Sequence, residues 1–264
     1  MRKGIVSSQR RLLEDKNSTM TTTASDIDRP LLLFDIPWST YKGIIDALPQ
    51  QHFRHSYDQG TLEIFSRLIY GVPWESYEAI LEAFGDRRFR HTYKEGTLEM
   101  MSPSEEHEWL KEFIGRLIEM AAYELDLPIK STGSTTQRHP ELLRGLEPDL
   151  SYYIQHESEV RGRRTSDSAS TLPPDLVVEV EITHKIIDRL EAYATLKVAE
   201  VWRYRDKTVE FFALGESGEY ARIETSVAVP QITSDDLTRF INMLDEHDEN
   251  SVVRAFVVSL RKKS

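Results

Sequence analysis

The chain has 264 residues, a net charge of -11 and no cysteine, with 39% hydrophobic and 29% charged residues. This composition predicts a soluble globular protein with one main domain, and the lack of cysteine excludes disulfides, thiolate metal sites and a cysteine nucleophile. The sequence contains no apolar run of membrane-spanning length and no secretory signal, so we expect a cytoplasmic protein without a membrane partner. The acidic charge argues against nucleic-acid binding through the overall field, but it leaves room for a local basic groove or a metal site.

Residues 1–30 are polar and rich in Ser and Thr, which predicts a disordered tail. A basic tail is the alternative, because basic side chains outnumber acidic ones in its first half. Met20 is an alternative start, in which case residues 1–19 would not belong to the natural protein.

A tandem repeat follows the tail. Residues 36–66 and 72–102 align at an offset of 36, with 14 of 31 positions identical, where average composition gives about two by chance. Each copy has a helical pattern after Pro-Trp and then two short extended runs, joined by Asp58-Gln59-Gly60 or Lys94-Glu95-Gly96, which predict hairpin turns. Two copies are too few for a solenoid, so we predict a duplicated helix–hairpin accessory unit at 31–71 beside a main domain at 72–264. His55 and His91 occupy matching positions, and half-buried strand histidines are favoured over a catalytic pair.

The remaining segments mix helices and strands, which indicates an α/β or α+β protein. Residues 105–125 predict an amphipathic helix with Trp109 and Phe113 on its apolar side. Extended segments are expected near 128–138 and 149–154, then a polar linker at 155–171, a hydrophobic strand at 176–182, and a helix over about 186–196. A hairpin follows at 201–214. The tail at 234–260 predicts two helices, with Ser234 or Asp235 as the N-cap.

Two strand-like segments carry the informative carboxylates, Glu147-Pro148-Asp149 and Asp175 to Glu181. Side chains alternate along a strand, so Glu179 and Glu181 share one face while Val178, Val180 and Ile182 share the other. Two carboxylates so close together repel each other unless a cation compensates them, and Mg²⁺ prefers oxygen ligands. The pattern therefore predicts a metal site formed by Asp149, Glu179 and Glu181. A solvent-facing strand surface is an equally good reading of the two glutamates alone.

Several phrases resemble one known family. "YKEGTLEMMSPSEEHE", "STGSTTQR", "GLEPDLSYYI", "PPDLVVEVEIT" and "DRLEAYATLKVAEVWRY" occur in order over about two thirds of the chain, and they resemble the Uma2 family (DUF820) of restriction-endonuclease-like proteins. The resemblance implies a PD-(D/E)XK nuclease core, a mixed sheet of four or five strands flanked by helices. It identifies Asp149 with the Asp of the PD motif and Glu179 with the acidic residue of (D/E)XK.

The sequence departs from this motif at the lysine, where Glu181 stands. The resemblance implies that the basic residue comes from the following helix, and the candidates are Lys185 and Arg189. Arg189 aligns better, but an arginine stays protonated and serves only to hold phosphate or stabilise charge. His107 and Glu108, at the start of the helix over 105–125, are further residues that reach the same site in one reading. A helix-start acid is the favoured role for Glu108.

The expected activity is hydrolysis of phosphodiester bonds in DNA by a Mg²⁺-dependent or Mn²⁺-dependent endonuclease, with Asp149, Glu179, Glu181, Arg189 and Lys185 as catalytic residues. A nuclease-fold protein that binds or scaffolds without catalysis is the alternative, favoured by the missing strand lysine and the acidic charge. A homodimer is left open.

Overall fold

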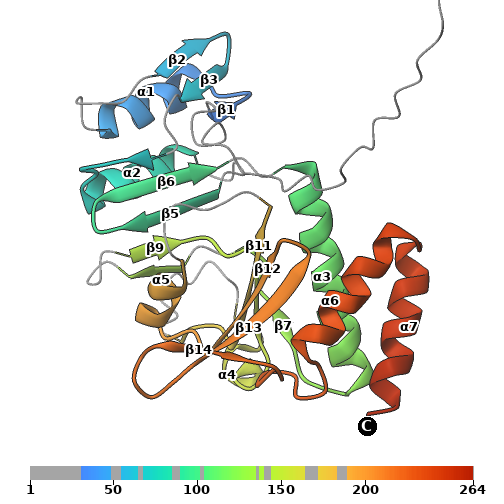
Figure 1. Cartoon of the computed structure of the whole chain (residues 1–264). Helices are drawn as coiled ribbons and strands as arrows, with labels where there is room; N and C mark the ends of the chain where they lie inside the picture. The colour runs from blue at the N-terminus through green and yellow to red at the C-terminus, as the bar shows by residue number, and fades with distance from the viewer. Residues whose placement is uncertain are drawn as a thin grey trace, which may run out of the picture.

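A computed structural model of the chain describes residues 31–48, 55–64, 68–84, 90–101, 104–134, 137–139, 144–163, 172–182 and 189–263 (Figure 1). The predicted tail at residues 1–30, with Met20, lies outside the described residues, and so does Lys185. In these residues the fold combines helices with three sheets, which confirms the predicted mixed α/β or α+β class.

The first copy of the repeat consists of one helix and a small sheet. Its strands have the order β1-β3-β2, with β2 at the edge. The elements are β1 (Leu31–Leu33), α1 (Trp38–Ala47), β2 (His55–Asp58) and β3 (Thr61–Ile64).

The second copy repeats this plan, but its sheet is larger. Strands β9 and β8 extend it to the order β4-β6-β5-β9-β8. Its elements are β4 (Leu68–Ile69), α2 (Trp74–Phe84), β5 (Arg90–Lys94), β6 (Thr97–Met101), β8 (Gln137–His139) and β9 (Arg144–Leu146). Strand β4 lies inside the predicted accessory unit at 31–71 but pairs with β6, so the second copy begins before that boundary.

Both predicted hairpins are present, but each turns through two residues instead of three, because Asp58 and Lys94 still pair within the strands. The turn residues Gln59, Gly60, Glu95 and Gly96 have φ angles of 44°, 86°, 45° and 84°. Two successive residues with positive φ match the right-handed twist of the flanking strands, and glycine takes this conformation without steric cost.

One tyrosine–histidine contact recurs in both copies. The Tyr41 hydroxyl lies 3.0 Å from His55 Nε2, and the Tyr77 hydroxyl lies 2.9 Å from His91 Nε2. Both histidines lie in strands, but only His55 is half-buried as predicted, whereas His91 is buried.

Tyr57 in β2 and Tyr93 in β5 also occupy equivalent positions in the two copies. Tyr57 stacks on Tyr41 at 4.4 Å between ring centroids, and Tyr93 stacks on Tyr77 at 4.5 Å. The two copies share one hydrophobic core, because helices α1 and α2 pack against each other. The duplication has thus preserved the internal packing of the unit.

In the part of the chain that the structure describes, the main sheet has six strands in the order β14-β13-β12-β11-β10-β7. Strands β11 and β12 are parallel, and the other neighbours are antiparallel. The strands are β7 (Lys130–Ser131), β10 (Leu150–Tyr153), β11 (Leu176–Glu181), β12 (Glu200–Arg205), β13 (Thr208–Leu214) and β14 (Tyr220–Ile223). The predicted strand at 176–182 and the hairpin at 201–214 are confirmed.

Helices cover both faces of this sheet (Figure 1). Helices α3, α6 and α7 pack on one side over a core that includes Val178, Val180 and Trp202, and α5 packs on the other side against Val177. The helices are α3 (Glu105–Glu124), α4 (Glu157–Val160), α5 (Arg189–Thr195), α6 (Ser234–Asn242), the 3-10 turn η3 (Met243–Asp245) and α7 (Glu249–Arg261). Within the described residues, no helix is both long enough and apolar enough to span a membrane.

Two details of the predicted helices were wrong. Trp109 is 43% exposed, because its indole nitrogen donates to Glu249 on α7 instead of entering the core. The N-cap of α6 is Thr233, which forms a capping box with Asp236. It lies one residue before the predicted Ser234, because the reciprocal pair satisfies two free N–H groups together.

Candidate functional site

The two predicted carboxylates meet where strands β10 and β11 run side by side. Leu150 pairs with Val178, so Asp149 is the next residue along this antiparallel register and faces Glu179. The Val180 backbone N–H donates to Asp149 Oδ2 at 2.5 Å, which fixes the aspartate against the neighbouring strand. Glu179 points away from the core that holds Val178 and Val180, as the alternation of side chains predicted.

Asp149 is buried, with 1% of its side chain exposed. Arg90 Nη1 lies 2.6 Å from its Oδ1, and His107 Nε2 lies 3.2 Å from its Oδ2. Arg90 also donates to the Pro148 carbonyl at 2.7 Å. A buried carboxylate is costly unless it is paired and hydrogen-bonded, and these contacts meet both needs. The second copy of the repeat therefore supplies the positive charge that compensates Asp149.

Glu179 is equally buried, and helix α5 supplies its partners. Arg189 Nη1 donates to both carboxylate oxygens at 2.7 Å, and the Tyr193 hydroxyl donates to Oε1. Arg189 and Tyr193 are four residues apart, so they share one face of the helix. The helix thus presents one cation and one hydroxyl donor to a single glutamate.

Arg189 also ties α5 to the second copy. Its Nε donates to Thr92 Oγ1 at 2.9 Å, and its Nη2 donates to the His91 carbonyl at 3.3 Å. Burial disfavours the charged guanidinium, but the adjacent Glu179 outweighs burial and raises the pKa of Arg189. Burial, and then Glu179, raise the pKa of Tyr193. Arg189 therefore remains a cation and Tyr193 remains protonated.

Three further acids surround this centre. Glu181 lies at the end of β11 on the same face as Glu179, with Arg205 Nη1 at 3.7 Å. Burial raises the pKa of Glu147, whose carboxylate lies 3.6 Å from His91 Nδ1. Glu108 binds Lys111 at 2.5 Å, and burial, which raises its pKa, is outweighed by that lysine, so the pKa of Glu108 is lowered. Each of these acids therefore lies beside a basic side chain.

The donor chemistry of this centre suits a hard divalent cation, since it offers carboxylate oxygens. The positive charges beside Asp149 and Glu179 are, however, guanidinium groups of Arg90 and Arg189. Within the part of the chain that the structure describes, no three His, Cys, Asp or Glu side chains are grouped to hold a metal.

Sequence reasoning considered His107 but missed Arg90, Thr92 and Tyr193. Arg90 stands in the phrase Phe-Arg-His, which occurs in both copies and therefore suggested only hairpin structure. Tyr193 had a detectable signal, because it follows Arg189 by four residues, the spacing that places two side chains on one helical face.

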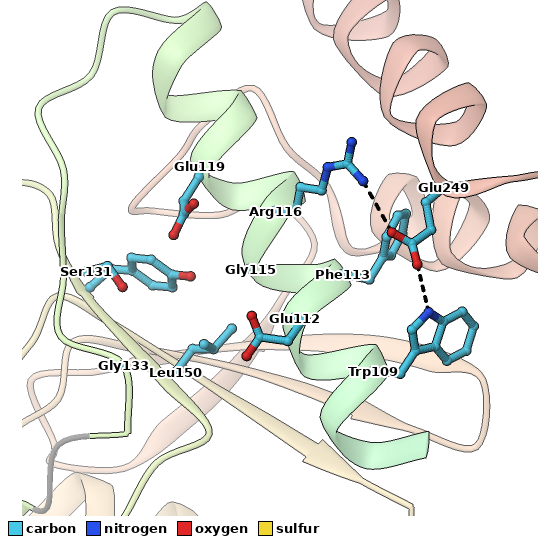
Figure 2. A pocket seen from close by; sticks show the side chains of 11 residues that line it. Trp109, Glu112, Phe113, Gly115, Arg116, Glu119, Ser131, Gly133, Leu150 and Glu249 are labelled. Carbon is cyan, nitrogen blue, oxygen red and sulfur yellow. Dashed lines mark hydrogen bonds and ion pairs between the residues drawn. The ribbon is translucent and has the colours of Figure 1, made fainter. Parts of the chain in front are cut away.

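A separate cavity of about 420 Å³ lies on the opposite side of the sheet, beside α3. Figure 2 shows Glu112 and Glu119 on one flank of α3, and Trp109 and Arg116 bound to Glu249 on the other. Neither Asp149 nor Glu179 lines it. The cavity and the carboxylate centre are therefore distinct.

Fold and site together define an α+β protein whose mixed sheet carries two buried acids at adjoining strands, each compensated by an arginine from a different element. Residues 74–243 match the profile of the Uma2 family, described as "Putative restriction endonuclease". That match covers more than half of the chain, and the chain belongs to the Uma2 family.

Among solved structures, the chain is similar to "a putative nuclease belonging to DUF820 from Anabaena variabilis ATCC 29413". The two are 13% identical with a TM-score of 0.39, and the alignment covers 63% of this chain and 90% of the other. No curated protein matches. The family match begins at Trp74, so the first copy of the repeat lies outside it.

Proposed function

We propose that the protein is a divalent-metal-dependent nuclease that hydrolyses phosphodiester bonds in DNA. The proposal rests on the pairing of Asp149 and Glu179 at adjoining strands in a chain of the Uma2 family. Asp149 and Glu179, with Glu181 as a third oxygen donor, would hold Mg²⁺ or Mn²⁺. When bound, such an ion lowers the pKa of a water molecule and offsets the negative charge of the phosphate.

In this proposal Arg189 is the phosphate-binding group. Its guanidinium is already directed at Glu179, and the same planar group binds phosphate oxygens through two parallel hydrogen bonds. It cannot act as the base, because Glu179 raises its pKa. Arg90 and His107 would hold the Asp149 carboxylate in place through their contacts with its two oxygens.

The experiment is a plasmid-nicking assay with Mg²⁺ or Mn²⁺, alongside a parallel RNA substrate. We expect Asp149→Asn and Glu179→Gln to lower cleavage at least about tenfold, which is about 1.4 kcal/mol of activation free energy. Glu210→Gln is the control, because Glu210 forms ion pairs with Arg203 and Arg222 on the sheet surface. Preferential cleavage of RNA would overturn the DNA assignment, and equal cleavage by all variants would overturn the site.

A second readout does not depend on activity. A metal that binds only the folded site raises the melting temperature, because it adds RT ln(1 + [L]/Kd) to the free energy of unfolding. The rise should be present in the wild type and in Glu210→Gln, and lost in Glu179→Gln. An equal rise in all three proteins would show that the metal binds elsewhere.

One structural observation favours a second candidate, a nuclease-fold protein that binds nucleic acid without cleaving it. Both buried acids are already compensated by Arg90 and Arg189, and Glu181 stands where the motif has lysine. Binding of DNA in a gel-shift assay, without cleavage and without any metal-induced change in melting temperature, would establish this candidate in place of the nuclease.

A further inference from the structure

The two copies of the repeat differ at one strand edge. In the second copy, β5 is flanked by β6 on one side and by β9 on the other. In the first copy, the equivalent strand β2 is flanked by β3 and ends its sheet. Within the described ranges, no strand occupies on β2 the place that β9 occupies on β5 (Figure 1).

The solvent exposure of matched side chains also differs between the two copies. Trp38 is 62% exposed, whereas its counterpart Trp74 is 9% exposed. Tyr77 is fully buried, whereas Tyr41 is only partly buried. The tyrosine–histidine and tyrosine–tyrosine contacts are the same in the two copies, so they do not explain the greater burial of the second copy. The paired strand β9 is part of what covers it.

Strand β9 meets a specific steric demand. Gly145 pairs with Tyr93, and a Cβ atom at Gly145 would lie 2.3 Å from the Tyr77 hydroxyl. A strand that docks here must therefore carry glycine opposite the tyrosine. In β9 a basic residue, Arg144, precedes that glycine, and the buried Leu146 follows it.

The first copy retains the surface that imposes this demand. The Tyr41 hydroxyl and His55 are placed like their counterparts, and Tyr57 stands where Tyr93 stands. The position that faces Arg144 in the second copy is Lys94, but it is Asp58 in the first. An acidic side chain at this place favours a basic residue on the incoming strand.

We infer that the open edge of β2, at Ser56–Asp58, binds an extended segment of another protein by strand addition, and that this segment reads basic residue, glycine, aliphatic residue. Strand addition joins backbone hydrogen bonds along the edge to side-chain pockets that select the sequence. A second copy of the chain paired through β2 does not meet the demand, because residues 55–58 contain no glycine. The inference stands independently of the proposed nuclease activity.

The experiment uses the full chain and a fluorescent synthetic peptide with the sequence of residues 141–148, ELLRGLEP. We expect saturable binding, measured by fluorescence anisotropy. Replacing the peptide glycine with valine should weaken binding at least about tenfold, because the added side chain meets the Tyr41 hydroxyl. Replacing it with sarcosine, which removes one backbone N–H, should also weaken binding, as strand addition requires.

A charge swap tests the register. Asp58→Lys lies on an exposed turn-side position, so we expect it to leave the fold intact, to weaken binding of the Arg-Gly-Leu peptide at least about threefold at low salt, and to restore binding of a Glu-Gly-Leu peptide. Unchanged affinities across these pairs would overturn the register, and no saturable binding to the wild type would overturn the proposal.

Hydrogen exchange distinguishes the other occupants of the edge. In the free chain the backbone N–H of Tyr57 should exchange quickly and should be protected when the peptide binds. Protection in the free monomer would show that the chain covers its own edge, and protection that appears only on dimerisation would show that a second copy does so. Either result would overturn the proposal.

Discussion

The two copies of the repeat share their aromatic and tyrosine–histidine contacts but have very different surroundings. The second copy supplies Arg90 to Asp149, and Thr92 and the His91 carbonyl to Arg189. The first copy contacts the rest of the molecule mainly through α1, which packs against α2 of the second copy. The comparison shows that one unit can be structural in one place and part of a polar site in another, and that its neighbours decide which. It also gives matched residue pairs for measurement.

The largest contrast is expected from Arg90. Arg90→Ala leaves the buried Asp149 without its closest cation, and breaking such a pair costs about 3–5 kcal/mol of unfolding free energy. Urea denaturation measures the loss. Adding Asp149→Asn should recover part of it, because the charge is then removed as well. A loss below about 1 kcal/mol, as for an exposed ion pair, would separate the second copy from the site.

The tryptophans of the two helices give the next contrast. Trp74→Ala removes a ring that is 9% exposed, whereas Trp38→Ala removes one that is 62% exposed. Removing a buried tryptophan costs about 3–5 kcal/mol, and we expect the exposed one to cost about 1 kcal/mol or less. Thermal melting of the two variants side by side is sufficient. Equal losses of stability would mean that Trp38 is buried by a further contact in solution.

A smaller difference is expected for the matched tyrosines. Tyr77→Phe removes the hydroxyl that lies 2.9 Å from the buried His91, and a buried group that loses a hydrogen bond costs about 1–3 kcal/mol. Tyr41→Phe removes the equivalent contact with His55 at a partly buried position, so we expect less than about 1 kcal/mol. Chemical denaturation that ranks Tyr41 above Tyr77 would contradict the comparison.

The smallest effect concerns pH. Burial raises the pKa of Glu147, although Arg90 of the second copy acts in the opposite direction. Because the pKa is higher in the folded state, folding takes up a proton. The resulting stabilisation is full below the ordinary glutamate pKa of about 4.3 and is lost as the pH rises through the folded-state pKa.

The variant Glu147→Gln isolates this effect, because glutamine resembles the neutral acid at every pH. The unfolding free energy of the wild type, relative to this variant, should fall over that pH interval. A constant difference between the two proteins would show that Glu147 has no raised pKa.

Local patterns predicted much of the fold, and contacts between distant segments set the rest. Alternation along 176–182 predicted Glu179 on one face and Val178 and Val180 on the other, and Gly60 and Gly96 predicted the two hairpin turns. The contact of Arg205 with Glu181 depends on the parallel pairing of β11 with β12. The sequence of either strand alone does not reveal that pairing. No periodic pattern in the sequence indicates that Arg90 is a partner of Asp149.

The two ion pairs of the site differ greatly in sequence separation. Arg189 and Glu179 are 10 residues apart, whereas Arg90 bonds to the Pro148 carbonyl, beside Asp149, across 58 residues. A short loop closes faster and at a lower entropic cost than a long one, so we expect the Glu179 pair to form early during folding. Asp149 also contacts the Val180 N–H and His107, and we expect it to lose its remaining water only when Arg90 reaches it. Dehydration of this acid would then belong to the late, long-range step of folding.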